Sequence, residues 1–151
     1  MLPGALFPRR CAGADRPDLS VRDTVIVFAR APRLGTVKRR LGRELGARVA
    51  LRFHCATLTG LLRGLVAERR FRTVLAVTPG QAKFPLPVLV ARVGQGAGDL
   101  GQRMDRACRR YRRGRVAVIG ADIPDAGPAD LRAAFRILGT ADIVFGPAAD
   151  G

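Results

Sequence analysis

The residues best suited to chemistry lie in loops that follow apolar runs. The first such loop, residues 31–40 (APRLGTVKRR), contains Lys38 and a turn at Gly35. A glycine turn lets backbone N–H groups approach an anion, and Arg and Lys side chains clamp phosphate oxygens, so the loop favours a diphosphate ligand. Ordinary surface is the alternative in so arginine-rich a chain, but Lys38 stands out because Lys83 is the only other lysine. The candidate binding residues of this segment are Arg30, Arg33, Gly35, Lys38, Arg39 and Arg40.

A second candidate element is the run GDLGQRM at 98–104, which begins a predicted helix. Asp99 with Gln102 three positions later is typical of a capping box, so Asp99 has a purely structural explanation. The functional alternative is that Asp99 contacts a ribose or base while Arg103 and backbone amides lie near phosphate. Both interpretations stay open, since one residue can fill both roles.

Carboxylates in the C-terminal third of the chain are candidates for a metal site. Asp122 follows an apolar run within IGADIPD (119–125), and Mg²⁺ or Mn²⁺ bound there would share its coordination with substrate phosphates. A turn-forming aspartate is the alternative, and it explains Asp125 better than Asp122. Asp150, within GPAADG (146–151), is a candidate for a second metal contact or a sugar-hydroxyl contact.

Other chemistries find little support in the sequence. His54 lies inside a long predicted helix, where a surface or satisfied core histidine is the expected role. Ser20 is the only serine and has no hydrolase motif around it. Three cysteines, odd in number and far apart, favour neither a disulfide framework nor a zinc site.

Composition describes one folded basic domain. The chain has 151 residues, 48% of them hydrophobic, and a net charge of +15 from 27 basic and 12 acidic residues. The run 106–115 (RACRRYRRGR) is a candidate patch for nucleic acid. Composition argues against that partner, because arginine makes up nearly all of the basic residues, as a GC-rich genome produces, and aromatic residues for base stacking are scarce.

Strands alternate with helices along the predicted elements. Strands are predicted at 24–30, 73–78, 87–93, 115–120 and 141–146, and helices at about 43–70, 100–113 and 128–138. This alternation predicts right-handed βαβ units in a doubly wound α/β sheet, whose strand-end loops converge on one site. In the helix at 100–113 the predicted buried stripe is Leu100, Met104, Ala107, Cys108 and Tyr111.

The ends and apolar runs of the chain bear on its location. Residues 1–22 are expected to form a flexible leader without a signal peptide's order of segments, and 23–151 to form the folded domain. No apolar run approaches the roughly 18 residues of a membrane span. We therefore expect a cytoplasmic protein of undetermined oligomeric state.

Four segments in order carry a family resemblance: VIVFARAPRLGTVKRRL, GDLGQRM, IGADIP and GPAADG. From about Val25 to Gly151 the chain resembles the small bacterial GT-A-type glycosyltransferases of the arsenosugar-biosynthesis or selenodomain-associated group, in the nucleotide-diphospho-sugar transferase superfamily. The resemblance implies a GT-A fold, a three-layer α/β sandwich with a mostly parallel sheet. The family continues beyond GPAxDG, so the resemblance also implies that the C-terminal part of the fold is missing here.

The same resemblance implies a function. The chain would bind a nucleotide-diphospho-sugar with Mg²⁺ or Mn²⁺ and transfer the sugar to a small acceptor. Residues Arg30 to Leu41, with Asp99 and Arg103, would hold the nucleotide; Asp122 would bind the metal, and Asp150 would line the sugar side. Arg39 departs from the family, where threonine is usual, so a hydroxyl contact is replaced by a charge.

Three other functions remain open at this point. The superfamily also contains nucleotidyltransferases, which share a basic loop after the first strand and an Asp-x-Pro after a later one. An inactive truncated remnant is a second alternative, because the predicted last strand has no helix after it. A basic nucleic-acid-binding protein is the third, and it would bind with steep salt dependence and without regard to Mn²⁺.

Overall fold

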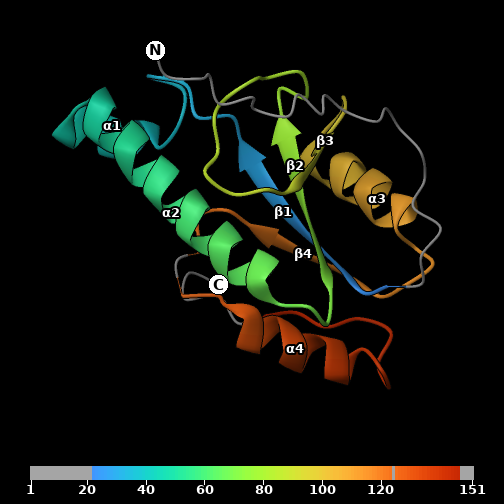
Figure 1. The fold of residues 1–151 in the computed structure, drawn as a ribbon. Helices are drawn as coiled ribbons and strands as arrows, with labels where there is room; N and C mark the ends of the chain where they lie inside the picture. Colours follow the sequence, from blue (N-terminus) through green and yellow to red (C-terminus); the bar gives the residue numbers. More distant parts are fainter. Residues whose placement is uncertain (1–21, 124, 147–151) are drawn as a thin grey trace, which may run out of the picture.

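A parallel four-stranded sheet forms the centre of the molecule (Figure 1). The computed structural model describes residues 22–123 and 125–146. The strands are β1 (Thr24–Arg30), β2 (Arg72–Thr78), β3 (Ala91–Gly94) and β4 (Val116–Gly120). Their order is β3-β2-β1-β4, with every neighbouring pair parallel. The predicted first, second and fourth strands are therefore confirmed to within a residue.

The two central strands are buried because helices cover both faces of the sheet. Val25, Ile26 and Val27 of β1 are fully inaccessible, and β2 is buried over five consecutive residues. Continuous apolar runs of this kind are typical of strands in a parallel sheet, where neither face meets water. The apolar pattern TVIVFAR therefore suits the position of β1 in the middle of the sheet.

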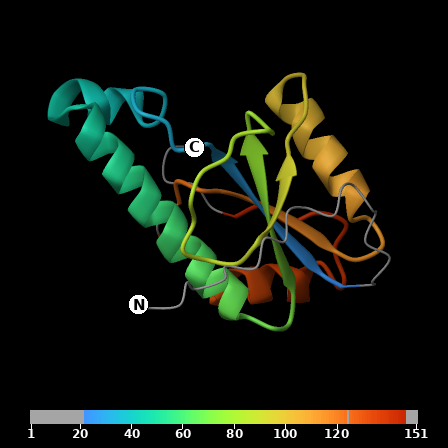
Figure 2. The same cartoon turned by 45° about the horizontal axis from the view of Figure 1, so that its top comes forward.

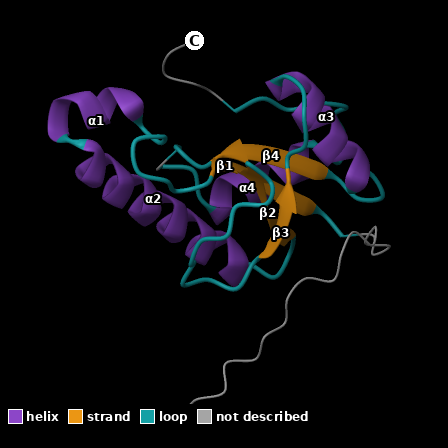
Figure 3. Ribbon diagram, turned by 90° about the horizontal axis from the view of Figure 1, so that it is seen from above, coloured by secondary structure: helices purple, strands orange, loops and turns teal. Residues whose placement is uncertain are grey.

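Four helices complete the layers: α1 (Arg39–Leu45), α2 (Ala47–Ala67), α3 (Leu100–Arg110) and α4 (Pro128–Ile137). α2 and α4 pack on one face of the sheet and α3 packs on the other (Figures 2 and 3). The predicted helix at about 43–70 is two helices, because Gly46 at φ 92° separates α1 from α2. The architecture is the predicted three-layer α/β fold with a parallel sheet.

The long helix α2 supplies much of the core on its face. Leu58, Leu62 and Leu65 are fully buried, and they join Leu131 and Phe135 of α4 in one apolar cluster with the sheet. Among the described residues, α2 alone is long and apolar enough to cross a membrane, at a mean hydropathy of 1.2. A core helix passes the same test, so this finding is weak grounds for a membrane span.

Three sequence predictions are corrected by the structure. The strand predicted at 141–146 is wrong: the segment joins no sheet, and Ile143 and Phe145 are 66% and 82% exposed. The strand predicted at 87–93 begins only at Ala91, since Pro87 has no N–H to donate and β3 is an exposed edge strand. The α3 stripe is only partly buried, because Leu100 and Met104 are exposed while Tyr111 is buried.

Candidate functional site

The strand order places two of the predicted loops next to each other. β1 lies at the centre, with β2 on one side and β4 on the other, so the chain reverses its direction of winding between them. In open α/β sheets, ligands bind at the carboxyl ends of the strands beside such a switch. The loops that follow β1 and β4 therefore flank the position where this fold class binds its ligands.

Lys38 and Asp122 meet at this position. The Lys38 Nζ lies 3.6 Å from the Asp122 Oδ2, and the two side chains are 28% and 65% exposed. The ladder between β1 and β4 continues one residue past the strand, because the Ala121 N–H donates to the Phe28 carbonyl at 3.0 Å. This bond holds the backbone just before Asp122 against β1. A cation and a carboxylate predicted separately thus belong to one site.

The backbone of the first loop is tightly folded around Lys38. The Thr36 N–H and hydroxyl both donate to the Arg33 carbonyl, at 3.1 and 2.9 Å, in a turn that Gly35 permits with φ at 74°. Lys38 itself has φ 46° and ψ 50°, the one positive φ outside glycine in the described part of the chain. Left-handed lysine is unfavourable and is often found at functional sites, where the surroundings maintain it.

The remaining basic residues predicted for the loop lie near Lys38 in the sequence, and none of them forms an ion pair with Asp122 in the described residues. Arg30 ends β1, Arg33 begins the turn, and Arg39 and Arg40 open α1. All four side chains are exposed to solvent. The end of β1 and the segment after it therefore carry four exposed positive charges in addition to Lys38.

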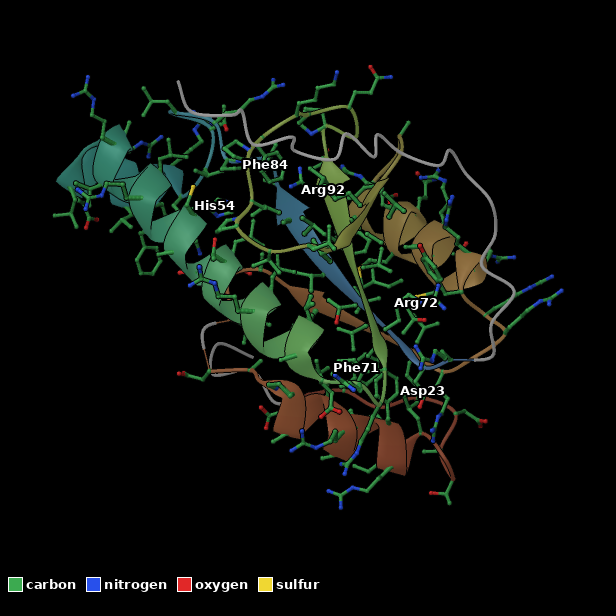
Figure 4. The ribbon with its side chains drawn as sticks, in the orientation of Figure 1. Asp23, His54, Phe71, Arg72, Phe84 and Arg92 are labelled. Atoms are coloured by element: carbon green, nitrogen blue, oxygen red, sulfur yellow. The ribbon has the colours of Figure 1, made fainter. Side chains whose placement is uncertain are left out.

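His54 lies beneath this edge and supports it. The side chain, buried to 6% exposure, reaches from α2 so that Nε2 donates to the Arg30 carbonyl at 3.0 Å (Figure 4). Burial lowers the pKa of His54; the bond to Arg30 opposes that shift, while the charge of Lys38 adds to it and that of Asp122 opposes it. Of the two roles predicted for His54, a surface or a satisfied core histidine, the structure shows the second.

Asp99 is engaged in the helix cap that the sequence predicts. Its Oδ1 accepts from the Gln102 N–H at 2.8 Å, and the Asp99 N–H donates to the Gln102 Oε1 at 3.1 Å. Arg103 turns back on the same loop, where its Nε donates to the Gly98 carbonyl at 2.8 Å. The structural role of Asp99 is confirmed, and its predicted role in nucleotide binding remains a prediction.

Gln95 is a site residue that the sequence reasoning missed. It follows β3, is 5% exposed, and its Nε2 donates to the carbonyls of Ala29 and Ala76 at 3.2 and 2.9 Å. Its Oε1 accepts from Arg103 Nη1 at 3.4 Å. One side chain therefore joins the carboxyl ends of β1 and β2 to α3. The only sequence signal was a long polar residue directly after an apolar run.

Asp122 could hold a metal ion only if a bound substrate supplied further ligands to that ion. No group of three or more His, Cys, Asp or Glu side chains gathers anywhere within 22–123 and 125–146. Mg²⁺ keeps several waters and commonly takes one or two carboxylates together with substrate phosphates, so a single aspartate beside a cationic loop suits that arrangement. The other predicted ligand, Asp150, lies outside the described residues.

A solved structure shares this fold. It is the "putative nucleotide-diphospho-sugar transferase" from Desulfovibrio desulfuricans G20, which superposes with a TM-score of 0.77 at 29% identity. The match covers 85% of this chain and 59% of the other, so the chain spans only part of that protein's length. No curated protein matches the chain in sequence.

A protein-family comparison covers residues 61–151, a stretch that includes Gln95, Asp99 and Asp122 and begins after Lys38. The stretch runs from the second half of α2 through α4 to the last residue. Since it makes up more than half of the sequence, the chain belongs to the family described as "Uncharacterized protein conserved in bacteria (DUF2064)".

Proposed function

We propose that this protein is a glycosyltransferase domain of the nucleotide-diphospho-sugar transferase superfamily. It binds a nucleotide-diphospho-sugar with Mg²⁺ or Mn²⁺ and transfers the sugar to a small acceptor in the cytoplasm. The folded domain is residues 23–151, preceded by a leader over 1–22. Within the superfamily, the four sequence segments favour the arsenosugar-biosynthesis or selenodomain-associated group.

The observation that carries this proposal is the pairing of Lys38 with Asp122 at the switch in strand order. Asp122 is a carboxylate suited to a metal ion and Lys38 is a cation suited to phosphate, and they lie next to each other at the edge of the sheet where such folds bind ligands. The similarity to the Desulfovibrio protein supports the same class of ligand, because that protein is described as a "putative nucleotide-diphospho-sugar transferase".

The proposed reaction breaks the bond between the anomeric carbon of the sugar and the diphosphate oxygen. That oxygen keeps the bonding electrons, a new bond joins the anomeric carbon to the acceptor, and the proton of the acceptor passes to water. Charge therefore develops on the departing diphosphate, and fixed cations next to it lower the barrier. Lys38 is the nearest such cation to Asp122, and Arg39 and Arg40 are exposed close by in the sequence.

The divalent ion, when bound, would neutralise further charge on the diphosphate. Asp122 would hold it, together with phosphate oxygens and water. Lys38 would then exchange its ion pair with Asp122 for contacts to phosphate. Their pairing at 3.6 Å between partly exposed groups is weak enough to permit that exchange.

Calorimetric titration with a panel of nucleotide-diphospho-sugars, with and without Mn²⁺, tests the proposal. We expect metal-dependent binding of one donor by the unaltered chain and at least tenfold weaker binding by Asp122→Asn. Asp125→Asn is the matched control, because it removes the same charge from the same loop, and it should bind like the unaltered chain. Equal affinity for the donor in Asp122→Asn and Asp125→Asn would refute the role of Asp122.

The product released during turnover separates this function from the nucleotidyltransferase alternative. A glycosyltransferase releases a nucleoside diphosphate, whereas a nucleotidyltransferase releases pyrophosphate. Chromatography of a reaction with the identified donor measures both products. Release of pyrophosphate would contradict the proposed reaction while leaving the nucleotide site in place.

A further inference from the structure

A cavity of about 490 Å³ lies at the end of the sheet opposite the candidate site. Its walls come from the segments that precede β1, β2 and β4 and from one side of α4. They include Asp23, Arg70, Phe71, Arg115, Arg132 and Arg136. β1 separates this end of the sheet from Lys38 and Asp122 by about 20 Å, since a strand rises roughly 3.3 Å per residue. The cavity is therefore a separate site.

Two of the four arginines are held in place by carboxylates. Arg115 makes a bidentate pair with Asp23, with Nε to Oδ1 at 2.9 Å and Nη2 to Oδ2 at 2.6 Å, and its Nη1 donates to the Phe135 carbonyl at 2.7 Å. Arg132 Nη1 lies 2.6 Å from Oε2 of Glu68. A guanidinium has five N–H donors, so Arg115 keeps two for another acceptor.

The other two arginines carry charge without a counter-ion. Arg70 lies in the turn before β2 and Arg136 in the last turn of α4, and both are exposed. Arg70 donates its backbone N–H to Glu68 Oε1 at 3.0 Å, but neither guanidinium is paired with a carboxylate in the part of the chain that the structure describes. The cavity thus has an excess of two positive charges, with arginines from different elements facing one hollow.

Aromatic rings give the cavity an apolar wall. Phe71 and Phe135 are buried, with ring centroids 5.7 Å apart, and the Arg115 guanidinium lies 5.9 Å from the centre of the Phe135 ring. Figure 4 shows Phe71 and Asp23 near α4, at the end of β1 and β2 away from His54. The positions of Arg115 and the rings are therefore set by the core, which leaves the cavity formed before any ligand arrives.

We propose that this cavity binds a small soluble phosphorylated compound with at least two negative charges. Arginine forks match the several acceptor oxygens of a phosphate, and spare donors on fixed guanidinium groups lose little freedom on binding. The volume is that of a small-molecule pocket rather than a groove for a polymer. This site is independent of the sugar-transfer function proposed above.

An NMR titration of the ¹⁵N-labelled full chain with inorganic pyrophosphate, without metal, locates the binding. We expect saturable shifts at the amides of Phe71, Ala129 and Arg132, which line the cavity or lie beside its arginines. The double variant Arg70→Gln/Arg136→Gln should raise the Kd for these shifts at least tenfold. Both side chains are exposed, so the spectrum should remain that of the folded protein.

Two control variants make the result specific. Arg52→Gln/Arg63→Gln removes the same charge from exposed positions on α2 and should change the Kd less than twofold. Lys38→Gln should leave the cavity shifts unchanged even if pyrophosphate also binds at the candidate site. Because the cavity shifts are read at their own amides, failure of the sugar-transfer proposal does not affect this test.

Several outcomes would overturn the proposal. Shifts confined to residues 31–40 and 121–123 would assign pyrophosphate to the candidate site alone. Shifts that do not saturate and that occur at arginines over the whole surface would show that pyrophosphate is attracted only by the net charge of the protein. Binding of a short DNA duplex at the cavity amides, with no response to pyrophosphate, would identify a nucleic-acid contact instead. A double variant that matches the Arg52→Gln/Arg63→Gln control would also refute the site.

Discussion

Replacement of Gln95 by alanine tests the connection between the sheet and the candidate site. The Gln95 side chain is buried at 5% exposure and donates hydrogen bonds to Ala29 of β1 and Ala76 of β2. Alanine removes both bonds and the acceptor that faces Arg103. The change therefore loosens three elements at once: the ends of two central strands and the helix α3.

The expected loss of stability follows from those contacts. Each of the two bonds to a carbonyl, at 3.2 and 2.9 Å, contributes a net stabilisation of about 1 kcal/mol. The carbonyl oxygens also lose a partner in a buried place, which adds to the cost. The contact with Arg103 is long at 3.4 Å and contributes little. We expect the free energy of unfolding to fall by about 2–3 kcal/mol.

Urea unfolding followed by circular dichroism measures this loss. With an m-value of about 2 kcal/mol/M, typical of a small domain, the midpoint should fall by about 1–1.5 M at an unchanged slope. Gln81→Ala is the matched control, because Gln81 is exposed and its replacement should leave the midpoint where it is. A Gln95→Ala midpoint within about 0.2 M of the Gln81→Ala midpoint would refute the reasoning.

Two further predictions concern the helix α2. Burial lowers the pKa of His54 below the value of 6.5 in the unfolded chain, so unfolding takes up a proton as the pH falls through that range. The free energy of unfolding should therefore decrease from about pH 7 to pH 5, and it should decrease more steeply than in His54→Gln. Urea titrations at each pH measure this, and an equal dependence of the free energy on pH in the two proteins would count against the prediction. Leu62 is fully buried and Leu89 is 95% exposed, so Leu62→Ala should lose about 2–5 kcal/mol of stability and Leu89→Ala less than about 0.5 kcal/mol. Thermal unfolding compares this pair directly, and similar melting temperatures would show that Leu62 is not part of the core.

The residues of the candidate site could be predicted from the sequence, but the contact between them could not. Lys38 and Asp122 each stood out from the local sequence, one as a rare lysine beside a glycine turn and the other as a carboxylate after an apolar run. Nothing in either segment says that they meet at 3.6 Å. Their contact depends on β4 pairing with β1, a choice of neighbour made across more than eighty residues of chain.

Local signals determined most of the elements. Apolar runs long enough for one strand predicted β1, β2 and β4, and the Asp99–Gln102 pair predicted the start of α3. Pro128 likewise marks the first turn of α4, where its missing N–H is not needed. These predictions are confirmed because each element is determined by residues within a few positions of one another.

Tertiary structure alone decided what depends on distant partners. The run ADIVFG at 141–146 has the composition of a strand, yet its residues pair with no strand in the described chain, because a strand forms only where a sheet edge accepts it. Gln95 looked like an ordinary loop residue until the packing of β1 beside β2 brought two carbonyls within its reach. Composition and spacing therefore established the α/β class, while long-range strand pairing decided which side chains share a site.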